Sequence, residues 1–181
     1  PGAVLRGNTI FGAGLHGIHV SRSVVQNGGS LVIGPPLVES NTVEGWGGGL
    51  GLTDVPGAQI FGNALSDNDT GILIEGLNDG VSIRRNNIND NTDFGAANIG
   101  SHWIDGEDNW WGDVSGPYDP IGTVEVPPET SDPTQEKNTD GLGNDVSEGI
   151  DYCMWSLQPR VLPYVFADGF ERGDLSRWDT S

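Results

Sequence analysis

Ile60-Phe61-Gly62-Asn63-Ala64-Leu65 returns 23 residues later as Ile83-Arg84-Arg85-Asn86-Asn87-Ile88. In both stretches an aliphatic side chain stands three residues before an asparagine, and another stands two residues after it. Related stretches lie on either side, so that five such asparagines are spaced by 33, 22, 23 and 23 residues: Asn8, Asn41, Asn63, Asn86 and Asn109. A unit of about 22 residues that recurs with its residue types in place predicts a protein built of stacked repeats.

A second element of the repeat is a short apolar alternation that opens with glycine. Its copies are Gly17-Ile18-His19-Val20, Gly49-Leu50-Gly51-Leu52 and Gly71-Ile72-Leu73-Ile74, with a weaker one at Gly95-Ala96-Ala97-Asn98-Ile99. Alternation places successive side chains on opposite faces of a strand, and the sequence lacks the apolar spacing of an amphipathic helix. The repeat unit is therefore predicted to contain two or three short β-strands.

These features predict an all-β fold, a right-handed parallel β-helix of about five coils with a C-terminal cap. Strands of neighbouring coils would lie about 4.8 Å apart, so that like residues stand on like residues. Leu5, Val38, Ile60 and Ile83 are predicted to form one internal stack. The recurring asparagine is expected at a bend, where it tolerates left-handed backbone angles and bonds to the neighbouring coil.

Four segments are predicted along the chain. The coils occupy residues 1–116, an acidic loop rich in proline and glycine follows at 117–149, then a cap at 150–166 and a tail at 167–181. A cap is expected because the open end of a β-helix is an unpaired edge. The run Gly45-Trp46-Gly47-Gly48-Gly49 is a candidate for a protruding loop.

Charge and composition narrow the range of partners. With 26 acidic and 8 basic residues the net charge is −18, which argues against nucleic acid and anionic membrane surfaces. No stretch approaches the roughly 20 apolar residues that span a bilayer, so membrane insertion is not expected. The single cysteine, Cys153, cannot form an internal disulfide and is expected to be buried. Because the repeat is already under way at Leu5, we interpret the sequence as part of a longer protein.

Motifs beyond the last repeat carry a resemblance to known proteins. They are Asn109-Trp110-Trp111-Gly112, Ser115-Gly116-Pro117 and Asp140-Gly141-Leu142-Gly143-Asn144-Asp145, followed by Tyr152 and Trp155. Together with the repeat, over residues 1–160, they resemble bacterial parallel β-helix repeat proteins of the carbohydrate-binding and sugar-hydrolase group. The resemblance implies a β-helix, and that broad group includes polysaccharide lyases, hydrolases, epimerases, adhesins and coat proteins.

The extreme C-terminus bears a second resemblance. Residues 166–178, Phe-Ala-Asp-Gly-Phe-Glu-Arg-Gly-Asp-Leu-Ser-Arg-Trp, resemble a closing motif found at the end of many secreted bacterial proteins. This resemblance implies a secreted or cell-surface location. The alternative is a tail strand whose Phe166, Phe170 and Trp178 dock on the cap.

No catalytic set is recognised in the sequence. Asn91-Thr92-Asp93 and Asn138-Thr139-Asp140-Gly141 are similar to one motif of polygalacturonase-type hydrolases, but the further carboxylates that such hydrolases need follow neither of them. His16 and His19 are expected on opposite faces of a strand, which disfavours a shared metal ion. No catalytic residue is therefore assigned.

Two groups of residues are candidates for binding. Trp46 offers an aromatic face to a sugar ring, and Arg84 with Arg85 offers a basic pair to a polysaccharide. The sequence from Glu136 to Gly141 follows the start of an oxygen-ligand calcium loop, although its twelfth position is Ser147. Four residues are candidate calcium ligands: Asn138, Asp140, Asn144 and Asp145.

The sequence favours a non-catalytic C-terminal β-helix region of a secreted or surface bacterial protein, with a structural or polysaccharide-binding role. One alternative is a fragment of a polysaccharide lyase, hydrolase or epimerase whose catalytic coils lie upstream of Pro1. Another is a calcium-stabilised component of a surface assembly. The expected partners are polysaccharides or cell-surface components, and the oligomeric state is left open.

Overall fold

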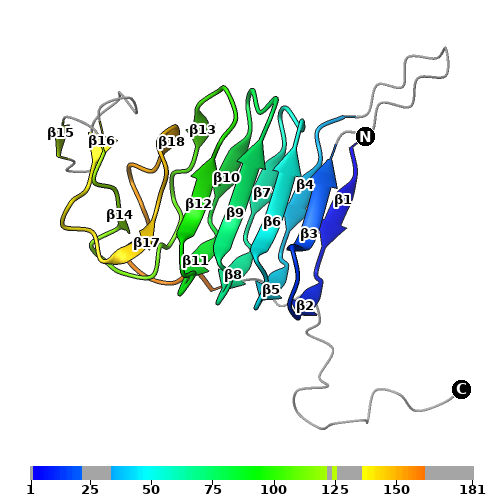
Figure 1. Ribbon diagram of the computed structural model, residues 1–181, viewed down its shortest axis with the longest axis horizontal. Coiled ribbons are helices and arrows are strands. Elements are labelled where there is room, and N and C mark those ends of the chain that lie inside the picture. Colours follow the sequence, from blue (N-terminus) through cyan, green and yellow to red (C-terminus); the bar gives the residue numbers. More distant parts are fainter. Residues whose placement is uncertain (1, 22–33, 122–123, 126–135, 162–181) are drawn as a thin grey trace, which may run out of the picture.

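The computed structural model describes residues 2–21, 34–121, 124–125 and 136–161. This part of the chain is all-β, and its strands follow one another in sets of three that we call rungs (Figure 1). The four complete rungs in the described residues are β1 (Val4–Arg6), β2 (Thr9–Phe11) and β3 (His16–Ser21); β4 (Leu37–Glu39), β5 (Thr42–Glu44) and β6 (Gly48–Thr53); β7 (Gln59–Phe61), β8 (Ala64–Ser66) and β9 (Thr70–Glu75); and β10 (Ser82–Arg84), β11 (Asn87–Asn89) and β12 (Phe94–Asn98).

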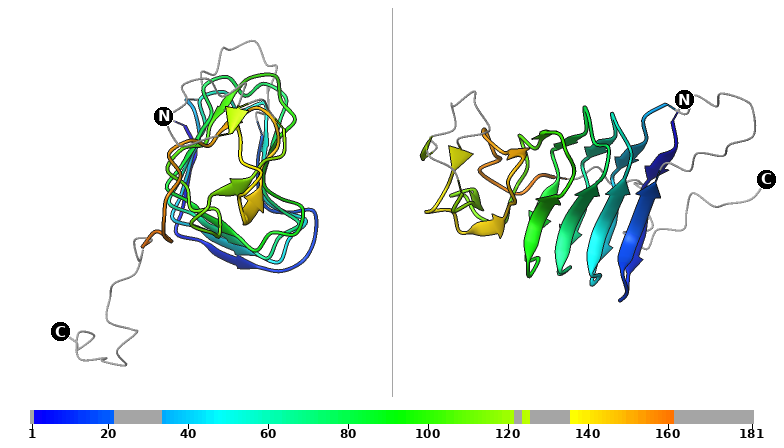
Figure 2. Two further views of the ribbon diagram at one scale, coloured as in Figure 1. Left: turned by 90° about the vertical axis from the view of Figure 1, so that its left-hand side faces the viewer. Right: turned by 45° about the horizontal axis from the view of Figure 1, so that its top comes forward.

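Three parallel sheets run along the stack, one for each strand of a rung. Sheet A has the order β1-β4-β7-β10 and continues with β13 (Ile104–Asp105) and β18 (Ile150–Asp151). Sheet B consists of β2, β5, β8 and β11, and sheet C of β3, β6, β9 and β12. Viewed along the stack, successive rungs lie over one another (Figure 2). The arrangement is consistent with a parallel β-solenoid.

The predicted internal stack is confirmed. Leu5 pairs with Val38, Val38 with Ile60, and Ile60 with Ile83 along sheet A. The last three of these side chains are no more than 1 % exposed. On sheet B the residues two positions after Asn41, Asn63 and Asn86 are fully buried in the same way: Val43, Leu65 and Ile88. Period-two alternation therefore puts one aliphatic column from each of these sheets into the core.

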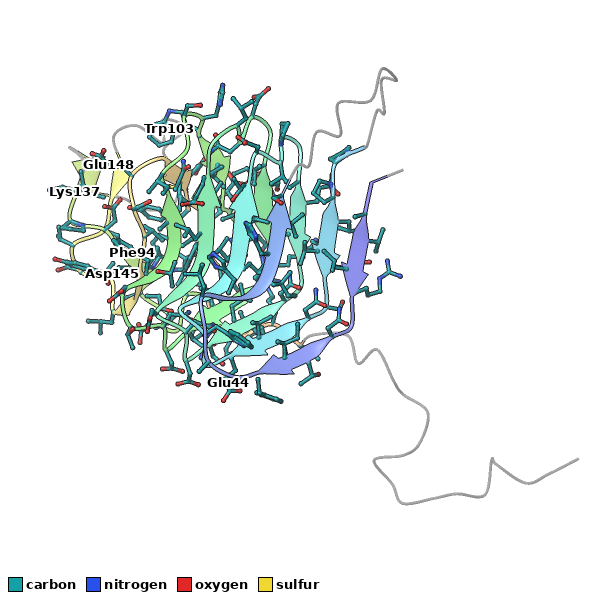
Figure 3. The ribbon with its side chains drawn as sticks, turned by 45° about the vertical axis from the view of Figure 1, so that its right-hand side comes forward. Glu44, Phe94, Trp103, Lys137, Asp145 and Glu148 are labelled. Carbon is teal, nitrogen blue, oxygen red and sulfur yellow. The ribbon has the colours of Figure 1, made fainter. Side chains whose placement is uncertain are left out.

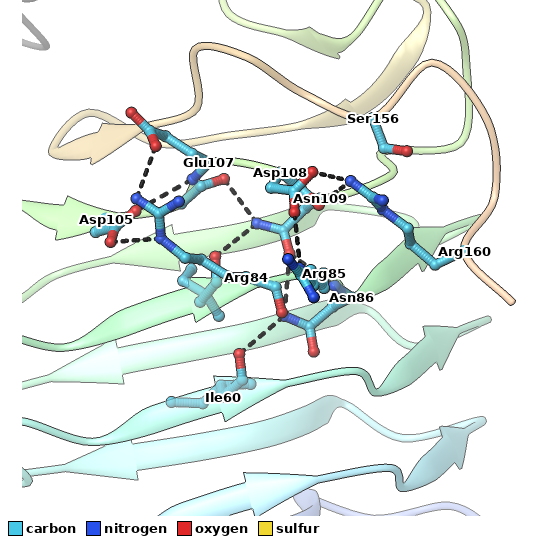
Figure 4. A network of polar contacts seen from close by, with 12 residues as sticks. Ile60, Arg84, Arg85, Asn86, Asp105, Glu107, Asp108, Asn109, Ser156 and Arg160 are labelled. Carbon is cyan, nitrogen blue, oxygen red and sulfur yellow. Dashed lines mark hydrogen bonds and ion pairs between the residues drawn. The ribbon is translucent and has the colours of Figure 1, made fainter. Parts of the chain in front are cut away.

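The recurring asparagines form a hydrogen-bonded ladder inside the first bend. Asn63 donates through its backbone N–H and its Nδ2 to Asn86 Oδ1, at 2.8 and 2.9 Å. Asn86 donates through Nδ2 to the carbonyl of Ile60 and to Asn109 Oδ1 (Figure 4). These amides are 0 % exposed, and they satisfy backbone groups that a bend would otherwise leave unpaired.

The left-handed residue of each bend is the one that precedes the asparagine. Its φ lies between 55° and 69° in all five copies: Gly7, Ser40, Gly62, Arg85 and Asp108. The expectation that asparagine itself takes the left-handed angle is therefore wrong. The preceding residue makes the turn, and the asparagine side chain is left facing the interior, where it bonds to two rungs.

The glycine-rich run at 45–49 does not form the predicted protruding loop, because Gly48 and Gly49 open strand β6 and are buried. A Cβ atom at Gly49 would lie 2.6 Å from the carbonyl oxygen of Gly71, and one at Gly71 would lie 2.5 Å from that of Gly95. Glycine is thus required where each strand of sheet C enters the crowded interior.

The C-terminal part adds short strand pairs to the stack. β14 (Pro117–Tyr118) pairs with β17 (Gly143–Asp145), and β15 (Val124–Glu125) pairs with β16 (Glu136–Lys137). Cys153 is 2 % exposed, so its predicted burial is confirmed. Residues 162–166 of the predicted cap and the tail at 167–181 lie outside the described residues. Within the described ranges, no helix has the length and apolar character needed to cross a membrane.

Candidate functional site

An open depression of about 360 Å³ lies on the outer face of sheet A. It crosses β4, β7 and β10 and is lined by Leu37, Glu39, Gln59, Ile60, Phe61, Ser82 and Arg84. Ile60 points into the core, so its two neighbours on β7 point outward. We call the six outward side chains of this set the Phe61 face. They combine an aromatic ring with an amide, a hydroxyl, a carboxylate and a guanidinium.

Phe61 stands in the middle of this polar surface. It is 38 % exposed and lies in register between Glu39 of β4 and Arg84 of β10. The guanidinium carbon of Arg85 lies 5.5 Å from the centre of its ring, a distance at which cation and ring attract each other. An aromatic side chain held in this way remains available to an apolar surface of a ligand.

Arg84 is fixed by two carboxylates. Its Nε lies 2.7 Å from Asp105 Oδ2, and its Nη2 lies 2.7 Å from Glu107 Oε2 (Figure 4). The hydrogen bond to Asp105, with the nearby charges, raises the pKa of Arg84 above its ordinary value, against the opposing effect of desolvation. The guanidinium is therefore charged at any physiological pH, and its fork is already engaged on two sides.

Arg85 lies at the left-handed position of its bend, with φ at 57°. Its Nε is 3.1 Å from Asp108 Oδ2, and Asp108 also pairs with Arg160. The structure therefore places both arginines of the predicted basic pair beside Phe61, each with an acidic partner. Strand alternation alone would have separated them, and the bend brings them to the same surface.

Trp46, the third predicted carbohydrate contact, lies elsewhere, in the turn between β5 and β6. Its indole is half-buried against the core and covers the backbone of the first rung, where Cβ atoms at Gly12 and Gly17 would lie 2.6 and 3.0 Å from it. Its backbone N–H donates to Asn68 Oδ1 at 3.0 Å. Trp46 therefore packs against the core and does not join the arginines.

The four candidate calcium ligands are divided between structural and exposed positions. Asn138 is buried and donates through Nδ2 to the carbonyls of Ser115 and Pro117, at 2.7 and 2.8 Å. Asn144 accepts from Asn91 N and Nδ2, and so extends a second asparagine ladder. The side-chain amides of both asparagines thus support the fold.

The two acidic candidates differ in their surroundings. Asp140 is exposed in a turn, whereas Asp145 is half-buried at the C-terminal end of the stack (Figure 3). Desolvation raises the pKa of the Asp145 carboxyl. In the parts of the chain that the structure describes, no three His, Cys, Asp or Glu side chains are grouped to hold a metal ion. Calcium binding stays a prediction.

Sequence reasoning missed a pair of stacked imidazoles on sheet C. The rings of His16 and His19 have centroids 5.1 Å apart and planes inclined by 20°. The expectation that they point to opposite faces is wrong, because Gly17 and Ile18 both face the interior. A Cβ atom at Gly17 would lie 2.3 Å from Val43 Cγ1, and Ile18 is 6 % exposed. This local departure from alternation puts both histidines on the outer face.

Polar contacts link the pair to later rungs. His19 Nε2 lies 3.1 Å from Thr53 Oγ1, and that hydroxyl donates to Glu75 Oε2 at 3.4 Å. His16 Nδ1 is buried and has no hydrogen-bond partner among the described residues. Protonating this nitrogen would leave a buried N–H without an acceptor, so we assign the neutral form to His16. Desolvation, with the charge of His19, lowers the pKa of His16, against the opposing effect of Glu75.

Acidification is expected to destabilise the chain through His16. Its pKa is lower in the folded state than in the unfolded state, so the unfolded chain binds more protons as the pH falls below about 6.5. The stabilisation is therefore complete above that pH and is lost as the pH falls toward the folded-state pKa. Melting temperatures measured between pH 7.5 and 5.5 give the slope of stability against pH, and this slope should be smaller in His16→Gln. An equal slope in both proteins would exclude His16 as the cause.

Comparison with protein-family models, with curated proteins and with solved structures finds no match for this chain. The Phe61 face is therefore the feature from which we propose a function. Phe61 could have been found from the sequence, since it is the one aromatic residue directly after an inward aliphatic of the sheet A stack. Arg6, Glu39 and Arg84 take that position in the other three rungs.

Proposed function

We propose that the chain is a non-catalytic part of a right-handed parallel β-helix of about five coils, and that its Phe61 face binds polysaccharide. The handedness follows the strong preference of parallel crossover connections for the right hand. A partial fifth coil is supported by β13, which pairs with β10, and by a parallel bridge between Asn87 and Trp110. A secreted or surface location is supported by the resemblance of residues 166–178 to the closing motif of secreted bacterial proteins.

Phe61 is the observation that carries the proposal. An exposed ring on a rigid parallel sheet can stack on the apolar face of a sugar, while neighbouring polar groups hydrogen-bond its hydroxyls. Gln59 and Ser82 stand in register with each other and flank the ring with an amide and a hydroxyl. Because the backbone of these residues is held by strands, little backbone entropy would be lost on binding.

The charge of the site favours a neutral polysaccharide. Arg84 and Arg85 each have a carboxylate partner, which offsets their charge and weakens their attraction for a uronate or a sulfate. The net charge of −18 also repels anionic polymers. Sugar hydroxyls, in contrast, can bond to the carboxylate oxygens without disrupting an ion pair.

Phe61→Ala is expected to weaken binding to neutral polysaccharide by at least about tenfold, the equivalent of 1.4 kcal/mol. Co-sedimentation with a panel of neutral and uronic polysaccharides, with and without calcium, measures it. Phe94→Ala is the matched control, because Phe94 is similarly exposed at 36 % but lies on β12 of sheet C (Figure 3).

Three results would count against this proposal. Equal losses in the two variants would show that the Phe61 face is not the binding surface. Stronger binding to uronic polymers would contradict the charge argument. Release of oligosaccharides by the purified chain would show an enzyme in place of a binding module.

A further inference from the structure

Residues 154–160 run along the outside of the bend that joins sheets A and B, and we call them the C-terminal strap (Figure 4). The backbone N–H of Ser156 donates to the carbonyl of Asn109 at 2.7 Å. Asn87 of β11 holds the far end of the strap, because its Nδ2 donates to the carbonyl of Arg160 at 2.9 Å and its Oδ1 accepts from Arg160 N at 2.7 Å. These contacts use the backbone of the strap, so they do not depend on the side chain at position 160.

The side chain of Arg160 shares one carboxylate with an arginine of the Phe61 face. Asp108 Oδ2 lies 3.1 Å from Arg85 Nε, and Asp108 Oδ1 forms an ion pair with Arg160 Nη2. The side chains of Asp108 and Arg160 are only 32 % and 34 % exposed, so solvent screens their attraction incompletely. A carboxylate with both oxygens engaged has little freedom to rotate. Arg160 therefore fixes the oxygen that Arg85 uses.

Arg85 in turn borders the aromatic ring at the centre of the site. Its guanidinium carbon lies 5.5 Å from the centre of the Phe61 ring. The Arg85 side chain is 60 % exposed, and a long exposed side chain samples many rotamers unless a partner holds it. A continuous series of contacts thus leads from the strap, through Asp108 and Arg85, to the ring of Phe61 (Figure 4).

We propose that Arg160 is a positioning residue of the Phe61 face, and that it holds Arg85 over Phe61 through Asp108. This inference rests on the proposed polysaccharide site. A side chain that is already ordered does not have to be immobilised when a sugar binds, and the entropy saved in this way strengthens binding. The C-terminal strap thereby regulates the site, because its displacement would release Arg85 and lower the affinity for polysaccharide.

Arg160→Gln is expected to weaken binding to neutral polysaccharide by about fivefold, the effect of having to immobilise one long side chain. The substitution keeps the backbone hydrogen bonds to Asn87, so the strap stays in place. Arg160→Lys keeps the positive charge and should bind more tightly than Arg160→Gln. A double-mutant cycle measures the coupling: in the Arg85→Gln background, Arg160→Gln should change the affinity by less than about 1.5-fold. Equal losses in the two backgrounds would show that Arg160 does not act through Arg85, and would overturn the proposal.

NMR relaxation of the Arg85 Nε–H group tests the positioning without any sugar. We expect this group to be ordered in the parent chain, and its order parameter to fall below about 0.6 in Arg160→Gln. An unchanged order parameter would overturn the proposal. Failure of the parent chain to bind any neutral polysaccharide would instead refute the polysaccharide site, and the order parameter would still decide whether Arg160 holds Arg85.

Discussion

Asn86→Ala is expected to lower the stability of the chain by about 4 kcal/mol and its melting temperature by roughly 10 °C. Asn86 is 0 % exposed and stands in the middle of the ladder. Its Oδ1 accepts from Asn63 N and Nδ2, at 2.8 and 2.9 Å. Its Nδ2 donates to the carbonyls of Ile60 and Arg84 and to Asn109 Oδ1.

The size of the effect comes from the partners that remain. Removing this buried amide leaves the backbone N–H of Asn63 without its acceptor and removes one hydrogen bond each from the carbonyl of Ile60 and from Asn109 Oδ1. A buried polar group that loses its partner costs about 1–3 kcal/mol. Asn8→Ala is the matched control, because Asn8 is the exposed end of the same ladder. We expect it to cost less than about 1 kcal/mol. Chemical denaturation measures the free energy of unfolding of both variants. Similar losses of stability in Asn86→Ala and Asn8→Ala would contradict an energetic role for the buried ladder.

Gly71→Ala is expected to cost about 3 kcal/mol, the upper part of the usual range for overpacking a core. The added Cβ would lie 2.5 Å from the carbonyl oxygen of Gly95 and 3.0 Å from Asn91 Nδ2. The first contact is with the backbone of the next rung, so no side-chain rotation relieves it. Spreading of β9 and β12 would also weaken the hydrogen bonds between them.

Gly62→Ser is the control for this substitution. Gly62 has φ at 63°, but nothing lies within 4 Å of its Cβ position, and Ser40 takes the equivalent place one rung earlier with φ at 55°. A cost below about 1 kcal/mol is expected. Thermal unfolding of Gly71→Ala and Gly62→Ser compares the stability lost to steric crowding with the stability lost to backbone strain. If Gly62→Ser were the more damaging, strain at the bends would outweigh packing in the glycine column.

The sequence predicted the register because stacking repeats the same residue types at the same position in successive rungs. Leu5, Val38, Ile60 and Ile83 follow directly from that rule. It could not show which bend residue adopts the left-handed angle, since serine, arginine and aspartate take it at Ser40, Arg85 and Asp108. Position in the bend, and not side-chain preference, decides the angle there.

The site was only partly predictable for a related reason. Strict alternation separates His16 from His19 and Arg84 from Arg85, whereas the glycine at 17 and the bend at 85 bring each pair together. Both departures arise from the local conformation of the backbone. The alternation of inward and outward residues in the sequence does not reveal them. Trp46 was predicted to contact a sugar because of its glycine-rich surroundings in the sequence. The glycines that accommodate its ring are instead Gly12, Gly14 and Gly17 of the first rung.

The Phe61 face and the asparagine ladder both depend on one register, and an engineered disulfide tests it most directly. Gln59 and Ser82 are partners on adjacent parallel strands, about 5 Å apart at their Cα atoms, which suits a disulfide. Gln59 and Arg84 are diagonal, roughly 8 Å apart, which is too far. Cys153, 2 % exposed, can remain in place. Mild oxidation of Gln59→Cys/Ser82→Cys should give an intramolecular crosslink, and Gln59→Cys/Arg84→Cys should give none. A crosslink only in the diagonal pair, or in neither, would contradict the register.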